Sequence, residues 1–115
     1  FERVIHHEVF HIIYLQHKGI FNDEEWIEFN NSKFKYAECS TCTKNISLEK
    51  YDKTEGFFTE YSKSTASEDM AEVYSHMIYL KKDQINKIRK LDPILNNKIL
   101  YIESKIKKIH NSFTF

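Results

Sequence analysis

The sequence has few of the residues that form flexible linkers, since it contains two glycines and one proline among 115 residues. Without a Pro/Gly-rich stretch between two segments, we predict one domain or part of one domain. A long hydrophobic run is also missing, because none approaches the ~20 apolar residues that span a bilayer. We therefore expect no transmembrane segment.

An excess of charge of one sign is absent as well, because Lys plus Arg and Asp plus Glu both total 17. No overall charge attracts the chain to nucleic acid or to an anionic membrane, so we expect no nucleic-acid partner. A hydrophobic fraction of 41% and an aromatic fraction of 15% are sufficient for a packed core. This composition excludes disorder throughout the chain.

Cysteine is scarce, and Cys39 and Cys42 form a single CxxC pair. A structural zinc site would need a second such pair or nearby histidines, and none follows in the sequence. A thioredoxin-like active site would need a βαβ context, which the pattern does not show. A local disulfide and two ordinary thiols both remain open for this pair.

Apolar residues recur with the period of an α-helix over most of the sequence, which predicts a mainly α fold. Five helices are expected: at residues 1–17, a short one beginning after Asn22, one from about 65–67 to about 80, one at 82–91 and one at 93–110. The first helix carries an apolar stripe of Val4, Ile5, Val9, Ile12, Ile13 and Tyr14. The lysines of the last two helices are expected to face solvent.

Residues 30–59 show no clear period, and we interpret them as a long loop with short strands near 34–36 and 57–59. A connection of this length without regular structure is usually functional or mobile.

The most informative motif is the HExxH sequence that runs from His7 to His11. On a helix, residues four apart lie on one face, so both imidazoles can reach a single metal ion. Glu8 follows the first His and projects toward the open coordination position, where it can take a proton from metal-bound water. The motif predicts a zinc peptidase, and two unrelated surface histidines are the alternative.

A catalytic zinc ion takes three protein ligands, and His17 is one candidate for the third. His7, His11 and His17 have the metzincin spacing, except that Tyr14 replaces the glycine that lets the chain leave the helix sharply. If the helix instead continues, His17 lies about 9 Å along the axis from His11, out of reach. Residues 75–79 resemble a metzincin Met-turn, so this reading remains an alternative.

An acidic third ligand fits the pattern better. Glu68 and Glu72 are four residues apart near the start of a predicted helix, so they share one face. In gluzincin-type sites one such acid ligates zinc, and the acid one turn later hydrogen-bonds the outer nitrogen of a ligating His. Tyr61 lies seven residues before Glu68, and its phenol could donate to the oxyanion of the reaction.

The segment from Thr59 to Tyr74 resembles the active-site segment of anthrax lethal factor-like metallopeptidases. Those enzymes have a Tyr seven residues before the ligating Glu, and the ligand is followed by x-x-Ala-Glu, as here. The segment is also similar to predicted zinc peptidases among bacterial surface lipoproteins, to whose pattern Phe57 and Tyr61 conform. The resemblance covers about residues 1–17 and 57–80.

This resemblance implies a role for each matching residue. His7, His11 and Glu68 would bind zinc (Zn2+), Glu8 would be the general base, Tyr61 would stabilise the oxyanion, and Glu72 would support a ligating His. It also implies a zincin-type helical subdomain, to which the sequence pattern adds the C-terminal helices. Because the metal motif already appears at residue 7, we expect this subdomain to lack the N-terminal sheet of such peptidases. We therefore expect residues 1–115 to be a single, N-terminally truncated catalytic domain that is secreted or at the bacterial cell surface.

The expected function is that of a gluzincin-type zinc-dependent endopeptidase acting on a peptide or protein substrate. Two alternatives remain: a metzincin-like peptidase with His17 as third ligand, and a helical interaction module or decayed peptidase fragment without activity.

Overall fold

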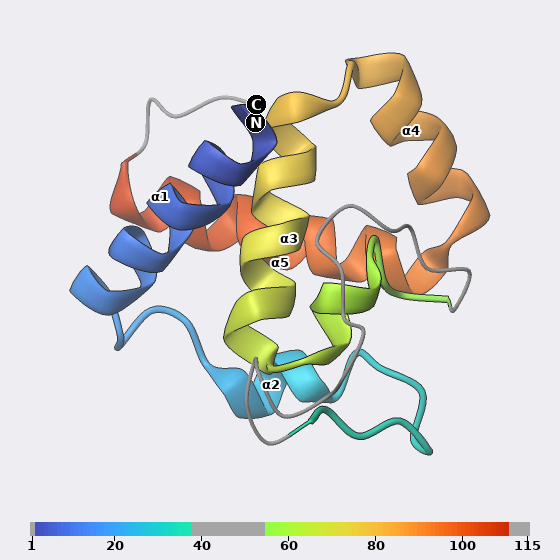
Figure 1. Ribbon diagram of the computed structural model, residues 1–115, viewed down its shortest axis with the longest axis horizontal. Coiled ribbons are helices and arrows are strands. Elements are labelled where there is room, and N and C mark those ends of the chain that lie inside the picture. Colours follow the sequence, from blue (N-terminus) through green and yellow to red (C-terminus); the bar gives the residue numbers. More distant parts are fainter. Residues whose placement is uncertain (1, 38–54, 111–115) are drawn as a thin grey trace.

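The computed structural model describes residues 2–37 and 55–110, and this part of the chain is mainly helical, as predicted (Figure 1). The elements are α1 (Glu2–Gln16), α2 (Asp23–Ile27), the 3-10 helix η1 (Glu60–Lys63), α3 (Ala66–Tyr79), α4 (Lys82–Leu91) and α5 (Pro93–Ile109). All five predicted α-helices are confirmed. None of them is both long and apolar enough to cross a membrane, within the described ranges.

The predicted strands near 34–36 and 57–59 are wrong, because neither segment forms a strand in the part of the chain that the structure describes, where Thr59 is a single bridge residue. Phe57 and Phe58 are buried in the interior, and the chain then turns at Thr59 into η1. The Thr59 hydroxyl accepts a hydrogen bond from the Ser62 backbone N–H, which starts a helical turn instead of continuing a strand. Cys39 and Cys42 lie outside the described residues.

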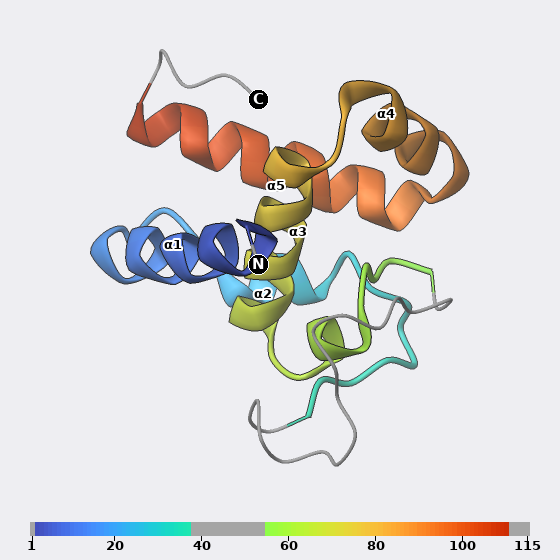
Figure 2. The same ribbon diagram turned by 45° about the horizontal axis from the view of Figure 1, so that its top comes forward.

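Helix α3 is the central element of the fold. Ten of its fourteen residues are buried, and it contacts α1, α2, η1 and α5. Helices α1 and α5 both pack against α3, and α4, which follows α3 in the chain, packs against α5 (Figures 1 and 2). A side chain on α3 can therefore meet groups from several parts of the sequence.

Side-chain caps determine where the two longest downstream helices begin. Thr65 accepts a hydrogen bond from the Glu68 backbone N–H at the start of α3. Asp92 does the same for Leu95 at the start of α5, where Pro93 occupies the first turn. The cap at Thr65 places Glu68 in the first turn of α3, at the end nearest to η1.

The buried face of α1 differs from the apolar stripe that we predicted. Ile5, Val9 and Ile12 are 48%, 38% and 56% exposed, whereas His7 and Phe10 are buried. The ring of Phe10 packs between those of Phe21 and Tyr74, with centroids 5.2 and 5.4 Å away. These aromatic contacts hold α1 against α3 and turn its histidines inward.

A fully buried ion pair joins α3 to α5. The Lys98 ammonium donates to Asp69 Oδ2 over 2.7 Å and to the Gly56 carbonyl over 2.7 Å. Asp69 Oδ2 also accepts hydrogen bonds from the Trp26 indole N–H and the Tyr36 hydroxyl, at 3.0 and 2.5 Å. The expectation that the lysines of α5 face solvent is therefore wrong for Lys98, which is 0% exposed.

We expect Lys98→Met to lower the free energy of unfolding by about 3–5 kcal/mol, because it leaves the Asp69 carboxylate buried without its counter-ion. The double variant D69N/K98M should lose less than the sum of D69N and K98M, since it buries no unpaired charge. Urea unfolding of the four proteins measures both effects, and strictly additive losses would contradict this account.

Candidate metal centre

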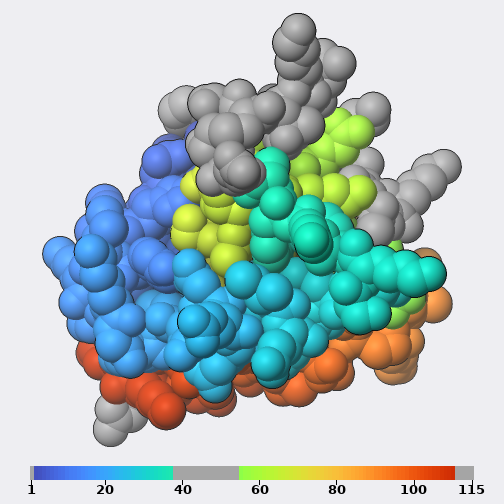
Figure 3. Space-filling model, turned by 90° about the horizontal axis from the view of Figure 1, so that it is seen from below, coloured from blue at the N-terminus to red at the C-terminus, as the bar shows by residue number. Residues whose placement is uncertain are grey.

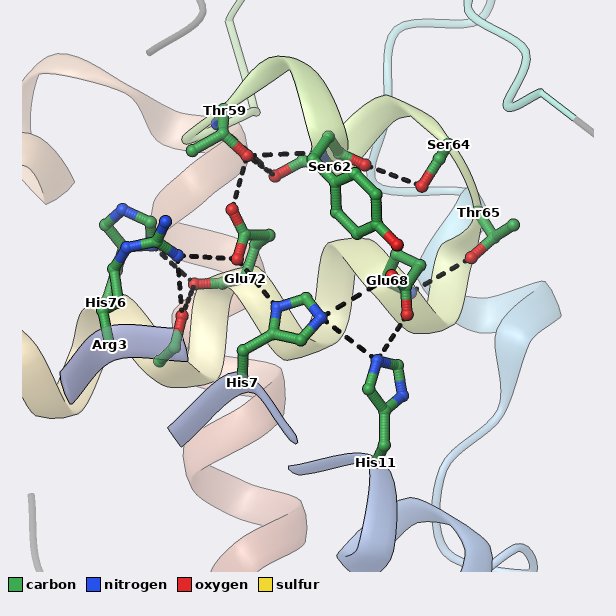
Figure 4. A network of polar contacts seen from close by, with 12 residues as sticks. Arg3, His7, His11, Thr59, Ser62, Ser64, Thr65, Glu68, Glu72 and His76 are labelled. Carbon is green, nitrogen blue, oxygen red and sulfur yellow. Dashed lines mark hydrogen bonds and ion pairs between the residues drawn. The ribbon is translucent and has the colours of Figure 1, made fainter. Parts of the chain in front are cut away.

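The two histidines of the HExxH motif lie on successive turns of α1 and face α3 (Figure 4). The Nε2 atoms of His7 and His11 are 3.2 Å apart. The side chain of His7 is 1% exposed and that of His11 is 25% exposed. The pair therefore reaches from the interior to the surface of the molecule.

Glu68 completes this cluster from the first turn of α3. Its Oε1 contacts His11 Nε2, and its Oε2 lies 3.6 Å from His7 Nε2. One donor atom from each of His7, His11 and Glu68 lies within 4.8 Å of the other two. Figure 3 shows the start of α3 at the molecular surface between α1 and residues 31–37, and the Glu68 side chain is 12% exposed there.

Glu72 lies behind His7, one turn further along α3 and 0% exposed. Its Oε2 accepts hydrogen bonds from His7 Nδ1 over 2.8 Å and from Arg3 Nη1 over 2.7 Å. Its Oε1 accepts one from the Thr59 hydroxyl over 2.6 Å. An ionised carboxylate can only accept, so the proton of this pair sits on His7 Nδ1, and His7 Nε2 is directed toward His11 and Glu68.

The cluster stabilises positive charge at His7. Burial alone would lower the pKa of His7, but the hydrogen bonds with Glu68 and Glu72 outweigh it and raise the pKa to about 9. Burial would raise the pKa of Glu68, and its hydrogen bonds with His11, His7 and Tyr61 instead hold it well below the ordinary value. The pKa of Glu72 is likewise lowered, in spite of burial, by His7, Thr59 and Arg3.

The donor set fits a zinc ion. Two imidazole nitrogens and one carboxylate are a common three-ligand set of catalytic zinc sites. Tetrahedral bonds of about 2 Å place two ligand atoms about 3.3 Å apart, close to the 3.2 Å between the Nε2 atoms of His7 and His11. Two facing ring nitrogens at this distance can share one proton or one cation, and they cannot both point a proton at each other.

Tyr61 and Glu8 lie near this cluster. Tyr61 is in η1, its ring centroid is 5.8 Å from that of His7, and it hydrogen-bonds with Glu68. Glu8 is exposed, and consecutive helical residues point about 100° apart, so it borders the face that carries His7. The structure therefore brings Tyr61 against the histidine and carboxylate cluster, whereas the side chain of Glu8 is exposed to solvent.

His17 is not part of the cluster found in the described residues. Helix α1 continues to Gln16 without the sharp exit that a metzincin needs, and Tyr14 remains helical. Met77 is within α3 rather than in a turn. The geometry therefore disfavours the alternative with His17 as third ligand.

Two residues that support the cluster, Arg3 and Thr59, are not among the site residues predicted from the sequence. Arg3 lies four residues before His7 on the same helical face, which is a signal that the sequence contained. No such spacing marks Thr59. Its contact with Glu72 depends on how η1 and the first turns of α3, which separate the two residues in the chain, fold back on each other.

A second histidine is buried beside the cluster. His76 is 0% exposed, its ring stacks on that of Phe58 with centroids 4.2 Å apart, and its Nδ1 lies 2.7 Å from the Glu72 carbonyl. Burial lowers the pKa of His76 from 6.5 to about 4. The folded protein therefore holds this imidazole neutral at pH values where the unfolded chain protonates it.

We expect the protein, in a metal chelator, to lose stability as the pH falls from about 6.5 to 5. In this window the unfolded state binds a proton at His76 that the folded state does not, so the free energy of unfolding rises with pH, by about 2 kcal/mol. The window ends above the pH at which Glu68 and Glu72, whose pKa values are also lowered by folding, become protonated in the unfolded chain. Urea unfolding at several pH values measures the slope. His76→Asn should flatten it, and an equal slope in this variant would exclude His76 as the cause.

One comparison with known proteins finds a match. A family model described as "Putative zinc-binding metallo-peptidase" matches residues 1–111. No curated protein and no solved structure matches the chain.

Proposed function

The chain belongs to this family of zinc-binding metallopeptidases, and we propose that it is a zinc-dependent endopeptidase of gluzincin type. The convergence of His7, His11 and Glu68 from two helices supports this proposal most strongly. In this reading the three side chains hold zinc and the chain is a single catalytic domain that acts on a peptide or protein substrate.

When bound, zinc would supply Lewis acidity toward a peptide carbonyl and toward a water molecule. The other steps are assigned to side chains of the protein. Glu8 takes the proton of the attacking water and passes it to the leaving amine, because it is the exposed carboxylate beside the proposed ligands. The Tyr61 phenol donates to the oxyanion that forms on the scissile carbonyl.

Glu72 has a supporting role in this proposal. By accepting from His7 Nδ1, it holds the imidazole in the tautomer whose Nε2 is available to a metal ion. The Arg3 guanidinium balances its charge, so the buried carboxylate remains ionised.

The proposed ligands can be tested by zinc binding alone. Wild-type protein should bind one zinc ion per chain, and Glu68→Gln should weaken binding by more than the ~100-fold that substitutions behind the ligands produce. Competition with a chromophoric chelator measures the dissociation constant. Glu103→Gln, in a partly exposed ion pair with Lys107 on α5, is the matched control and should bind as wild type does. Equal affinities for E68Q and wild type would remove Glu68 from the site.

The proposed base requires a separate test. Glu8→Gln should abolish peptide hydrolysis while zinc content stays at the wild-type level, because the amide cannot accept the proton of water. Hydrolysis of a quenched fluorescent peptide library and elemental analysis measure the two properties. Glu2→Gln, exposed on the same helix, is the control. Normal cleavage by E8Q would refute the assignment, and zinc binding without cleavage by wild type would favour a non-catalytic module.

A further inference from the structure

We propose that Thr59 is a positioning residue of the metal centre, and that its single hydroxyl group aligns both Glu72 and the segment that carries Tyr61. This inference rests on the proposed function and extends it to a residue outside the proposed ligand set, whose hydrogen bonds lead to Glu72 and Ser62. Thr59 is 1% exposed, precedes η1 in the chain, and hydrogen-bonds both to Ser62 of η1 and to Glu72 of α3 (Figure 4).

The direction of the hydrogen bonds around Thr59 follows from its partners. Its hydroxyl carries one proton, and it donates that proton to Glu72 Oε1 over 2.6 Å because an ionised carboxylate can only accept. The hydroxyl of Ser62 lies 3.2 Å from that of Thr59, so Ser62 must be the donor between them. Thr59 therefore accepts from Ser62 and donates to Glu72, and only the second of these bonds reaches the carboxylate behind His7.

The contact with Glu72 controls the orientation of His7. Oε2 of Glu72 receives the hydrogen bonds from Arg3 and His7, and Thr59 supplies the bond to Oε1. Because both oxygens of Glu72 accept hydrogen bonds from fixed donors, one orientation of the carboxylate plane is favoured. Removing the Thr59 donor would leave Oε1 desolvated, and rotation of the carboxylate to regain a donor would move the acceptor away from His7 Nδ1.

The second contact of the same hydroxyl concerns η1. Thr59 Oγ1 accepts from the Ser62 backbone N–H over 3.3 Å, and the Ser62 hydroxyl accepts from the Thr59 backbone N–H over 3.4 Å. This reciprocal cap starts the turn that contains Tyr61. Thr59 Oγ1 therefore hydrogen-bonds both to the turn that contains Tyr61 and to the Glu72 carboxylate, and it fixes the distance between them.

The test compares two substitutions that both weaken the cap of η1 but differ at Glu72. Thr59→Val keeps the side-chain shape and removes the donor to Glu72, whereas Ser62→Ala removes part of the cap and leaves that donor in place. T59V should raise the zinc dissociation constant by about tenfold. S62A should stay close to wild type, and Thr59→Ser, which retains a hydroxyl, should restore binding.

Two measurements separate positioning from general stability. Zinc affinity is determined by chelator competition in a buffer without urea. The pH is one at which circular dichroism shows that each variant is folded. The visible spectrum of the cobalt-loaded protein reports the ligand arrangement, and it should change in T59V and stay unchanged in S62A. If valine prevents folding, Thr59→Cys, whose thiol is a weak donor, should show a smaller loss in the same direction.

The outcomes for this inference and for the proposed function are distinct. If wild type binds no zinc, or His7→Ala binds it as well as wild type does, the proposed function fails and the role of Thr59 with it. If zinc binding depends on His7 but T59V and T59C bind as wild type, the inference about Thr59 is overturned while the site stands. Equal losses in T59V and S62A overturn it too, since they indicate an effect of the cap alone.

Discussion

The hydrogen bond between His7 Nδ1 and Glu72 Oε2 is the interaction on which the rest of the candidate site depends. It links α1 to α3 at a point where both side chains are almost fully buried, so neither group can exchange its partner for water. It also determines which ring nitrogen of His7 faces the cluster. The Arg3 guanidinium lowers the energetic cost of this arrangement, because its positive charge compensates the negative charge of the buried Glu72 carboxylate.

The other buried acid of α3, Asp69, also needs a positive partner and hydrogen-bond donors to compensate its burial. Asp69 is paired with Lys98 of α5 and accepts further hydrogen bonds from Trp26 and Tyr36. Glu68 lies directly before Asp69 and one turn before Glu72 in the same helix. Glu68 is therefore followed in α3 by two buried carboxylates whose positions are set by partners in other elements, which is the kind of support that a preorganised site needs.

The fold and the site could be predicted from the sequence to different extents. The helices were predictable because their caps, such as Thr65 and Asp92, and their apolar period are local properties of the chain. The buried face of α1 was not, since Ile5, Val9 and Ile12 of the predicted apolar stripe are exposed, whereas the polar residues His7 and Arg3 face the interior. Hydrophobic periodicity alone cannot reveal a face whose polar groups are satisfied by a distant helix.

The sequence by itself determined which residues share a face: His7 with His11, and Glu68 with Glu72, because a spacing of four is close to one helical turn. It also contained the match to a zinc-binding metallopeptidase family. Only the tertiary structure decided that these two faces meet, that Lys98 is buried, and that Thr59 and Arg3 converge on one carboxylate. The physical reason is that helix formation depends on neighbours along the chain, whereas contacts across 65 residues or more depend on how the completed helices pack.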